Sequence, residues 1–317
     1  MKKTYRILGL VLALTLVLLG ANVPNTASYL RAATKKKVTS KKTKTKKAAT
    51  YKSFVMENAK VKKSGKYYLK NMDPEDTMEI GVCESKDGYF VATDLPTHFF
   101  ANGTYAYYLG EDLKLYRYSF SSGTSKVMKT ISTEDPYYEE WSLKYFYKGK
   151  FYLQKFDVDK ERYEVYVYII GSKKLKRVMK HCHLLDRNGS FVLGQKKEIS
   201  SRATSPITLY RFSSKGLKKV KRLANHGGRG VKIGKFFYFT AYPSEVTKAD
   251  GSKNRMSRVI LYRVRKDGSG QKKKATYNSS SAEKRVYAST IRGTYCVFTI
   301  SDGRVTSNYK CSYKKRS

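Results

Sequence analysis

The sequence predicts an all-β protein whose main domain, residues 51–317, repeats a four-stranded antiparallel module. Three observations predict this fold. A turn that ends in glycine recurs, with 38 to 59 residues between successive turns, at Gly65, Gly103, Gly149, Gly189, Gly234 and Gly293. Each turn is followed by a segment rich in Tyr and Phe, the composition that strands favour. No segment after residue 33 has convincing helical periodicity.

Within a module, the first two strands flank the glycine turn. Two of the turns are Asn-Gly (Asn102-Gly103 and Asn188-Gly189), the strongest short-range hairpin signal, because both residues accept positive φ. Third strands are expected at residues 115–120, 165–170, 209–214 and 261–266, which read L-Y-R-Y-S-F, V-Y-V-Y-I-I, L-Y-R-F-S-S and L-Y-R-V-R-K. A Gly/Ser turn and a basic fourth strand follow, as at residues 126–131 and 217–223.

Four strands in every 40–50 residues, approximately, is the pattern of a β-propeller blade. Six modules therefore predict a six-bladed β-propeller. The last module shows only three strands, and we expect residues 52–56 to supply its fourth, which closes the ring with the N-terminal strand and removes exposed edges. A pair of β-sandwiches or an open β-meander is the alternative fold.

One blade carries a family resemblance. Residues 261–274, L-Y-R-V-R-K-D-G-S-G-Q-K-K-K, resemble the blade ending of TolB-like six-bladed propellers, and are similar to those of uncharacterised secreted bacterial propeller proteins. The full Asp-Gly-Ser-Gly turn occurs in this blade alone; residues 121–123 and 213–216 have S-S-G and S-S-K-G instead. The resemblance implies the fold and assigns no activity, because propellers host many functions.

Residues 1–33 have the pattern of a secretory signal peptide. A basic start (Lys2, Lys3 and Arg6) precedes an apolar run at residues 7–20, which is short for a membrane span. Cleavage is expected after Ser28 or Ala33, and an uncleaved anchor is the alternative. No later segment is apolar enough to span a bilayer, so we expect no membrane span in the mature chain and a secreted or cell-surface location.

Residues 34–50 contain eight Lys and no acid. Self-repulsion and scarce apolar groups predict a disordered Lys-rich linker. It is either a solvated spacer or a polycationic tether to an anionic envelope.

The charge of the chain is unevenly distributed. The 317 residues carry a formal net charge of +40. Residues 51–164 contain 17 basic and 18 acidic residues, whereas residues 165–317 contain 36 and 7. Solubility explains many surface lysines, but this skew favours an anionic partner, whose binding releases counterions. The candidate anion-binding residues are Lys218, Lys219, Arg263, Arg265, Lys272, Lys273 and Lys274.

Catalytic motifs are scarce. The sequence has no G-x-S-x-G elbow, no H-E-x-x-H and no paired C-x-x-C, and we predict no cofactor, metal or assigned catalytic residue. The one constellation that suits an acidic-glycan lyase or hydrolase is Glu134, Asp135, Glu139, Glu140 and Trp141, whose carboxylate separation the sequence does not give.

Two segments resemble metal-binding motifs but lack the ligands that the motifs require. His181 and His183 flank Cys182, but no third ligand for zinc is evident. The alternation of Asp157, Asp159 and Glu161 begins like a calcium loop, but its sixth and twelfth positions are Arg and Tyr instead of Gly and Glu.

Cys296 and Cys311 are candidates for a disulfide, because they lie on the two strands of one predicted hairpin and an exported protein meets oxidising conditions. Cys83 and Cys182 lie in separate modules.

The sequence therefore favours a secreted, non-enzymatic binding or scaffold propeller that engages an anionic cell-envelope polymer or an acidic protein partner. A carbohydrate-active enzyme on an acidic glycan and an extracellular nucleic-acid-binding protein are the alternatives. Export and the repetition of the aromatic–basic pattern in every module, which suits packing between blades, disfavour nucleic acid.

Overall fold

The computed structural model describes residues 51–56, 61–71, 80–88, 90–96, 98–135, 138–172, 174–196 and 204–313. These residues belong to one compact unit, Ala48–Ser317. They form antiparallel strands, with no α-helix among them, which confirms the predicted all-β fold. In this part of the chain no helix is long and apolar enough to cross a membrane. The predicted signal peptide, the Lys-rich linker and the acidic segment 73–79 lie outside the described residues.

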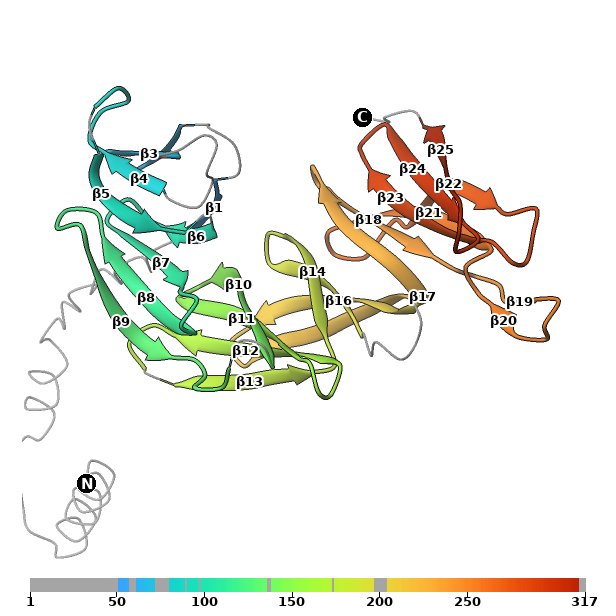
Figure 1. Cartoon of the computed structure of the whole chain (residues 1–317), viewed down its shortest axis with the longest axis horizontal. Helices are drawn as coiled ribbons and strands as arrows, with labels where there is room; N and C mark the ends of the chain where they lie inside the picture. Colours follow the sequence, from blue (N-terminus) through green and yellow to red (C-terminus); the bar gives the residue numbers. More distant parts are fainter. Residues whose placement is uncertain are drawn as a thin grey trace, which may run out of the picture. The chain divides into compact units, whose positions relative to one another are not determined.

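The strands pair in chain order as successive up-and-down sheets, which we call meanders 1 to 6 (Figure 1). Meander 1 comprises β2 (Lys62–Ser64), β3 (Tyr67–Asn71), β4 (Ile80–Cys83) and β5 (Phe90–Leu95). Meander 2 comprises β6 (His98–Ala101), β7 (Tyr105–Leu109), β8 (Lys114–Ser119) and β9 (Thr124–Thr130). Meander 3 comprises β10 (Glu139–Tyr147), β11 (Lys150–Asp157), β12 (Arg162–Ile169) and β13 (Leu175–Lys180).

Meanders 4 and 5 share one long strand, β17 (Gly216–Ile233), which joins them in a seven-stranded sheet. Meander 4 comprises β14 (His183–Asn188), β15 (Phe191–Gln195), β16 (Ser205–Ser213) and the first part of β17. Meander 5 comprises the end of β17 with β18 (Phe236–Ala241), β21 (Arg258–Arg265) and β22 (Lys272–Asn278). A small hairpin of β19 (Val246–Thr247) and β20 (Lys253–Asn254) lies between β18 and β21, which accounts for the longest spacing between turn glycines.

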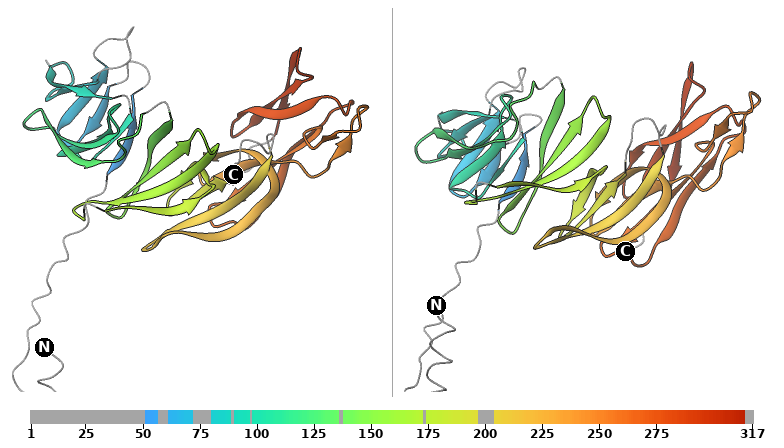
Figure 2. Two further views of the ribbon diagram at one scale, coloured as in Figure 1. Left: turned by 60° about the horizontal axis from the view of Figure 1, so that its bottom comes forward. Right: turned by 90° about the horizontal axis from the view of Figure 1, so that it is seen from below.

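Meander 6 has three strands, β23 (Arg285–Ile291), β24 (Tyr295–Ser301) and β25 (Thr306–Ser312). The colour order in Figure 2 follows the meanders from one end of this unit's chain to the other. Each four-stranded meander has the strand order of a propeller blade. The six modules of the sequence are thus six meanders in the described residues, and a closed six-bladed ring stays a prediction.

The predicted role of the N-terminal strand is wrong. β1 (Lys52–Val55) pairs antiparallel with β6, in meander 2, instead of with β25 in meander 6. The reason is side-chain packing: Phe54 lies opposite Phe99, their rings stack with centroids 5.3 Å apart, and both are buried in one core cluster. The polar strand β25 is exposed along almost its whole length and offers no comparable apolar surface.

Five of the six turn glycines have positive φ, whereas Gly293 does not, and in the two Asn-Gly turns the positive φ is confined to the glycine, because Asn102 and Asn188 do not have it. Positive φ occurs at Gly65, Gly103, Gly149, Gly189 and Gly234. Close packing is a second reason for glycine at Gly65 and Gly103, because a Cβ on Gly65 would lie 2.8 Å from the Cα of Gly103. Meanders 1 and 2 therefore meet at a point where only glycine fits.

The core lies between successive meanders. Five hydrophobic clusters occupy the five seams from meanders 1–2 to meanders 5–6, and none of the clusters among the described residues joins meander 6 to meander 1. The first residue of the repeated L-Y-R segment is fully buried in each case, as Leu115, Leu209 and Leu261 show. Most of the abundant Tyr residues in these seams are structural, as expected; Tyr118, Tyr152 and Tyr168 are examples.

Candidate functional site

The third and fourth strands of the meanders repeat one local geometry. In meanders 2 to 5 the fourth strand has a β-bulge at the same place, opposite the first two residues of the third-strand segment: Leu115/Tyr116, Val165/Tyr166, Leu209/Tyr210 and Leu261/Tyr262. The bulge adds one residue to the fourth strand and resets its register. Between this bulge and the hairpin turn the register is unbroken, and there the Arg of each L-Y-R segment lies opposite a Lys of the fourth strand.

Three meanders contain such a like-charge pair: Arg117 lies opposite Lys126, Arg211 opposite Lys218 and Arg263 opposite Lys272. Like charges directly opposite each other destabilise a sheet. None of the ion pairs among the described residues neutralises any of these six cations. We call these three sites the Arg–Lys pairs.

Aromatic rings hold the Arg side chains in place. Each guanidinium lies over the ring of the residue that opens the second strand, with centroid distances of 4.6 Å for Arg117 over Tyr105, 5.8 Å for Arg211 over Phe191 and 4.2 Å for Arg263 over Phe236. A cation–π contact positions a guanidinium and leaves its charge unneutralised. Each pair is therefore an ordered cationic site.

Meander 3 departs from this pattern. Its third-strand segment has Val167 where the others have Arg, and Val167 lies opposite Lys176. Its neighbour Arg177 is neutralised by Glu164. Meander 3 therefore contains the fourth-strand Lys without the pair, which makes Lys176 a natural control.

The structure places the predicted anion-binding residues in different settings. Lys218, Lys272 and Arg263 belong to the Arg–Lys pairs, whereas Lys219 and Lys273 lie opposite Tyr210 and Tyr262. Arg265 lies opposite Phe236, and the ammonium of Lys274 lies 5.2 Å from the ring centroid of Tyr313. Of the three consecutive lysines 272–274, the first therefore lies opposite an Arg, and the other two lie beside Tyr side chains.

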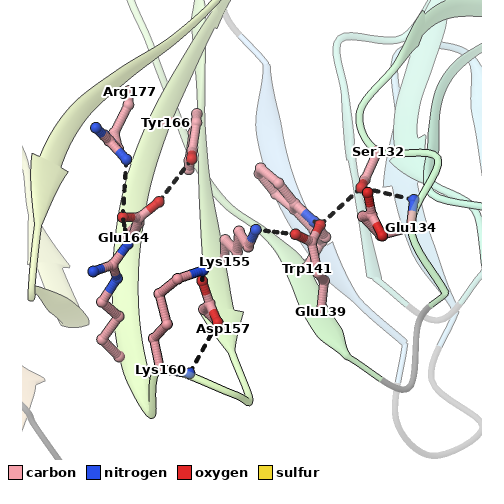
Figure 3. Close-up of polar contacts among 11 residues, drawn as sticks. Ser132, Glu134, Glu139, Trp141, Lys155, Asp157, Lys160, Glu164, Tyr166 and Arg177 are labelled. Carbon is pink, nitrogen blue, oxygen red and sulfur yellow. Dashed lines mark hydrogen bonds and ion pairs between the residues drawn. The ribbon is translucent and has the colours of Figure 1, made fainter.

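Of the acidic cluster that the sequence singled out, Glu139 pairs with a cation on meander 3 (Figure 3). Glu139 accepts hydrogen bonds from Ser132 Oγ at 2.7 Å and from Trp141 Nε1 at 3.0 Å, and pairs with Lys155. Burial opposes ionisation of Glu139, but the three donors outweigh burial and hold its pKa below the usual value. The Lys155 ammonium also lies 5.8 Å from the Trp141 ring centroid.

Two further carboxylates of meander 3 are neutralised in the same way. Glu164 is 3% exposed at its side chain and contacts Arg162 at 3.2 Å and Arg177 at 3.1 Å, and Tyr166 donates to it at 2.7 Å. Asp157 pairs with Lys160 at 2.9 Å. In Figure 3, Glu139, Asp157 and Glu164 each contact a cation, whereas Glu134 contacts Ser132 through its backbone N–H.

Two cavities lie beside Glu139. One, of about 760 Å³, is lined by His98, Glu111, Glu139, Glu140 and Trp141, among others. The second, of about 390 Å³, is lined by Glu134, Tyr138, Glu139, Asp157, Asp159 and Lys160. The structure therefore brings four of the five predicted residues to these cavities, while Asp135 lines neither.

No group of three or more His, Cys, Asp or Glu side chains suited to a metal ion occurs in the part of the chain that the structure describes. His181 has a φ of 52°, outside the strand region, so it does not alternate with His183 as a regular strand would require. The His183 ring stacks on Tyr163, with centroids 4.5 Å apart.

Cys296 and Cys311 are direct partners in the β24–β25 register, and both are thiols in this structure. The hairpin that the sequence predicted is therefore present, and the disulfide itself stays a prediction. Burial, together with the neighbouring Cys311, raises the pKa of Cys296 to about 12.

Sequence reasoning missed a cavity of about 500 Å³, which we call the seam pocket, between meanders 3 and 4. Its lining includes Tyr147, Lys148, Lys150, Arg211, Phe212 and Lys218. The only sequence signal for it was Lys218 itself, because the other cations come from a different module.

Comparisons with known proteins assign no family. No protein-family model and no curated protein matches the chain. Among solved structures, an oligogalacturonate lyase in complex with manganese has a TM-score of 0.38 at 8% identity, covering 84% of this chain and 86% of its own. One of two prolyl endopeptidases has a TM-score of 0.41 at 12% identity, covering 84% and 42%. The calcium-binding protein regucalcin from Agrobacterium tumefaciens has a TM-score of 0.35 at 6% identity, covering 78% and 83%.

Proposed function

We propose that this chain is a secreted or cell-surface, non-enzymatic binding protein of propeller type, which engages an anionic cell-envelope polymer through its Arg–Lys pairs. An acidic protein surface is the second partner of the same chemistry. The single observation that carries the proposal is the recurrence of an uncompensated Arg–Lys pair at the same position of three meanders.

The Arg–Lys pair destabilises the sheet, and its recurrence in three meanders suggests that an anionic partner offsets the repulsion. An anion placed between the Arg and the Lys turns repulsion into two attractions, and a polymer with repeated charges serves several pairs at once. Counterion release then makes the affinity fall with salt. The predicted export supports an envelope polymer over an intracellular polyanion.

The test is retention on an immobilised anionic polysaccharide at rising salt. Lys218→Gln and Lys272→Gln should each weaken binding about fivefold, since one Lys near an anionic surface contributes on the order of 1 kcal/mol. Lys176→Gln is the matched control, because it removes the same charge from the equivalent strand position, where Val167 replaces Arg. Equal losses in all three variants, or binding that ignores salt, would contradict the proposal.

A second candidate function is a glycan-active enzyme, favoured by the cavity of about 760 Å³ that Trp141 lines together with three carboxylates, Glu111, Glu139 and Glu140. Sugar rings pack on aromatic side chains, and carboxylates supply acid–base chemistry. Three donors hold Glu139 in its ionised form, which suits a base or nucleophile and opposes a general acid. Turnover of an acidic glycan that disappears in Glu139→Gln or Glu140→Gln would support this function, and inactivity on a broad panel would count against it.

A further inference from the structure

We propose that the seam pocket is a binding site for a phosphate group carried on a sugar-sized unit. This inference rests on the proposed function, because Arg211 and Lys218 form one of the Arg–Lys pairs, and it names the anion that this pair takes. It adds two cations from the neighbouring meander and an aromatic wall.

The charge of the seam pocket comes from two separate hairpins. Lys148 and Lys150 belong to the β10–β11 hairpin, and Arg211 and Lys218 to β16 and β17. No acidic side chain is among the lining residues. Four cations around about 500 Å³ match the charge of a phosphate monoester, roughly −1.5 to −2 at neutral pH, better than the single charge of a carboxylate.

The two walls of the seam pocket are fixed to each other. The backbone N–H of Leu184 donates to Gln154 Oε1 at 2.7 Å in the buried seam, and Tyr145 Oη donates to the Leu185 carbonyl at 3.1 Å. Near the pocket, Lys150 Nζ donates to the Ser214 carbonyl. The cations therefore converge before any ligand binds, which lowers the ordering cost of binding.

Aromatic rings form one wall. Tyr147 and Phe212 stack with centroids 4.9 Å apart. Behind them, the Arg187 guanidinium lies 5.3 Å from the Tyr147 centroid and 5.1 Å from the Phe212 centroid, and its Nε donates to the Gly189 carbonyl at 2.7 Å. Phe212 is 3% exposed, so the half-buried Tyr147 is the part of this wall that a sugar ring can contact, while Arg187 adds positive potential.

The chemistry of the donors selects a tetrahedral oxyanion. Arg211 presents a planar fork of N–H groups, and three lysine ammonium groups are point charges that approach from other directions. A phosphate has three acceptor oxygens for such donors, whereas a carboxylate has two in one plane. The size of the cavity falls within the range of small-molecule sites and leaves room for one sugar ring beside the phosphate.

The test is isothermal titration of the whole chain at low salt with three probes: glucose 6-phosphate, inorganic phosphate and glucuronate. We expect glucose 6-phosphate to bind one site, at least fivefold more tightly than inorganic phosphate, and both to bind more tightly than glucuronate. Arg211→Gln and Lys148→Gln should each weaken glucose 6-phosphate at least fivefold, and Lys176→Gln should leave it unchanged. Unchanged thermal unfolding of the variants shows that they are folded.

Failure of this inference and failure of the proposed function give different results. Lys272→Gln lies outside the seam pocket, so it should weaken polymer retention and leave glucose 6-phosphate binding intact. Glucuronate binding as tight as glucose 6-phosphate, equal losses in Lys148→Gln and Lys176→Gln, or no binding of either phosphate probe would overturn the phosphate site, even if polymer retention persists. A phosphate site without polymer retention would instead overturn the proposed function.

Discussion

Arg211 and Lys218 lie directly opposite each other on β16 and β17, and no carboxylate in the described part of the chain forms an ion pair with either. Such a pair costs stability without a ligand. Lys218→Gln should therefore raise the Tm by about 1–2 °C in low-salt buffer, because it removes the repulsion.

An anionic polysaccharide should reverse the order of the two Tm values, so that the native chain has the higher one. It should stabilise the native chain more than the Lys218→Gln variant, because a ligand that binds the folded state raises Tm according to its affinity. Differential scanning calorimetry with and without the polymer checks both signs. A lower Tm for the variant in both conditions would show that Lys218 is a stabilising surface residue.

Neighbouring lysines should differ in effect. Lys218 lies opposite Arg211, whereas Lys219 lies opposite Tyr210. Since successive side chains of a strand point to opposite faces, only Lys218 shares a face with Arg211. We expect Lys218→Gln to lower polymer affinity at least twofold more than Lys219→Gln, measured by retention at one salt concentration. Equal effects would mean that net charge matters and the pair does not.

Glu139 should make the free energy of unfolding depend on pH. Its pKa is held low in the folded chain, so its contribution is present above the unfolded value of about 4.3 and is lost as pH falls through the folded pKa. Urea unfolding between about pH 5 and 3 should show a steeper loss for the native chain than for Glu139→Gln. At pH 7 that variant should be about 2 kcal/mol less stable, because three donors lose their charged acceptor.

The acid test has its own internal comparison. The pKa values of Glu164 and Asp157 are also lowered, and both residues remain in the native chain and in the variant. Only the difference between the two curves of stability against pH therefore reports Glu139. Parallel curves for the native chain and Glu139→Gln would contradict this role.

Cys296 and Cys311 should form a disulfide on oxidation, since they are direct partners on adjacent strands. Closing a loop of this length stabilises a fold by about 3 kcal/mol. Mass mapping of the exported protein without reductant checks the bond, and Cys311→Ser is the control for its effect on unfolding. Recovery of both cysteines as free thiols after export would remove the prediction.

Local signals in the sequence predicted most of the strands. The Asn-Gly and other Gly turns, and the aromatic runs after them, depend on backbone φ and strand propensity, which neighbouring residues determine. Pairing over long distances was not predictable in this way. The partner of β1 depends on whether Phe54 finds Phe99, 45 residues further along the chain, and a repeat pattern does not contain that information.

The site was less predictable than the fold for a related reason. The hairpin turn, where Ser213 pairs with Gly216, decides whether Lys218 or Lys219 lies opposite Arg211, and basic runs look the same in either register. The seam pocket joins Lys148 to Lys218 across two modules, which no local motif records.

The most direct measurement is the salt dependence of binding to an anionic polysaccharide for the native chain and for a Lys126/Lys218/Lys272→Gln variant, which loses the Lys of every Arg–Lys pair. A plot of log affinity against log salt should lose about 2 to 3 units of slope in the variant, whereas Lys176→Gln should leave the slope within about one unit of the native value. Slopes that do not differ between the native chain and the triple variant, or tighter binding to duplex DNA than to the polysaccharide at the same salt, would contradict the account.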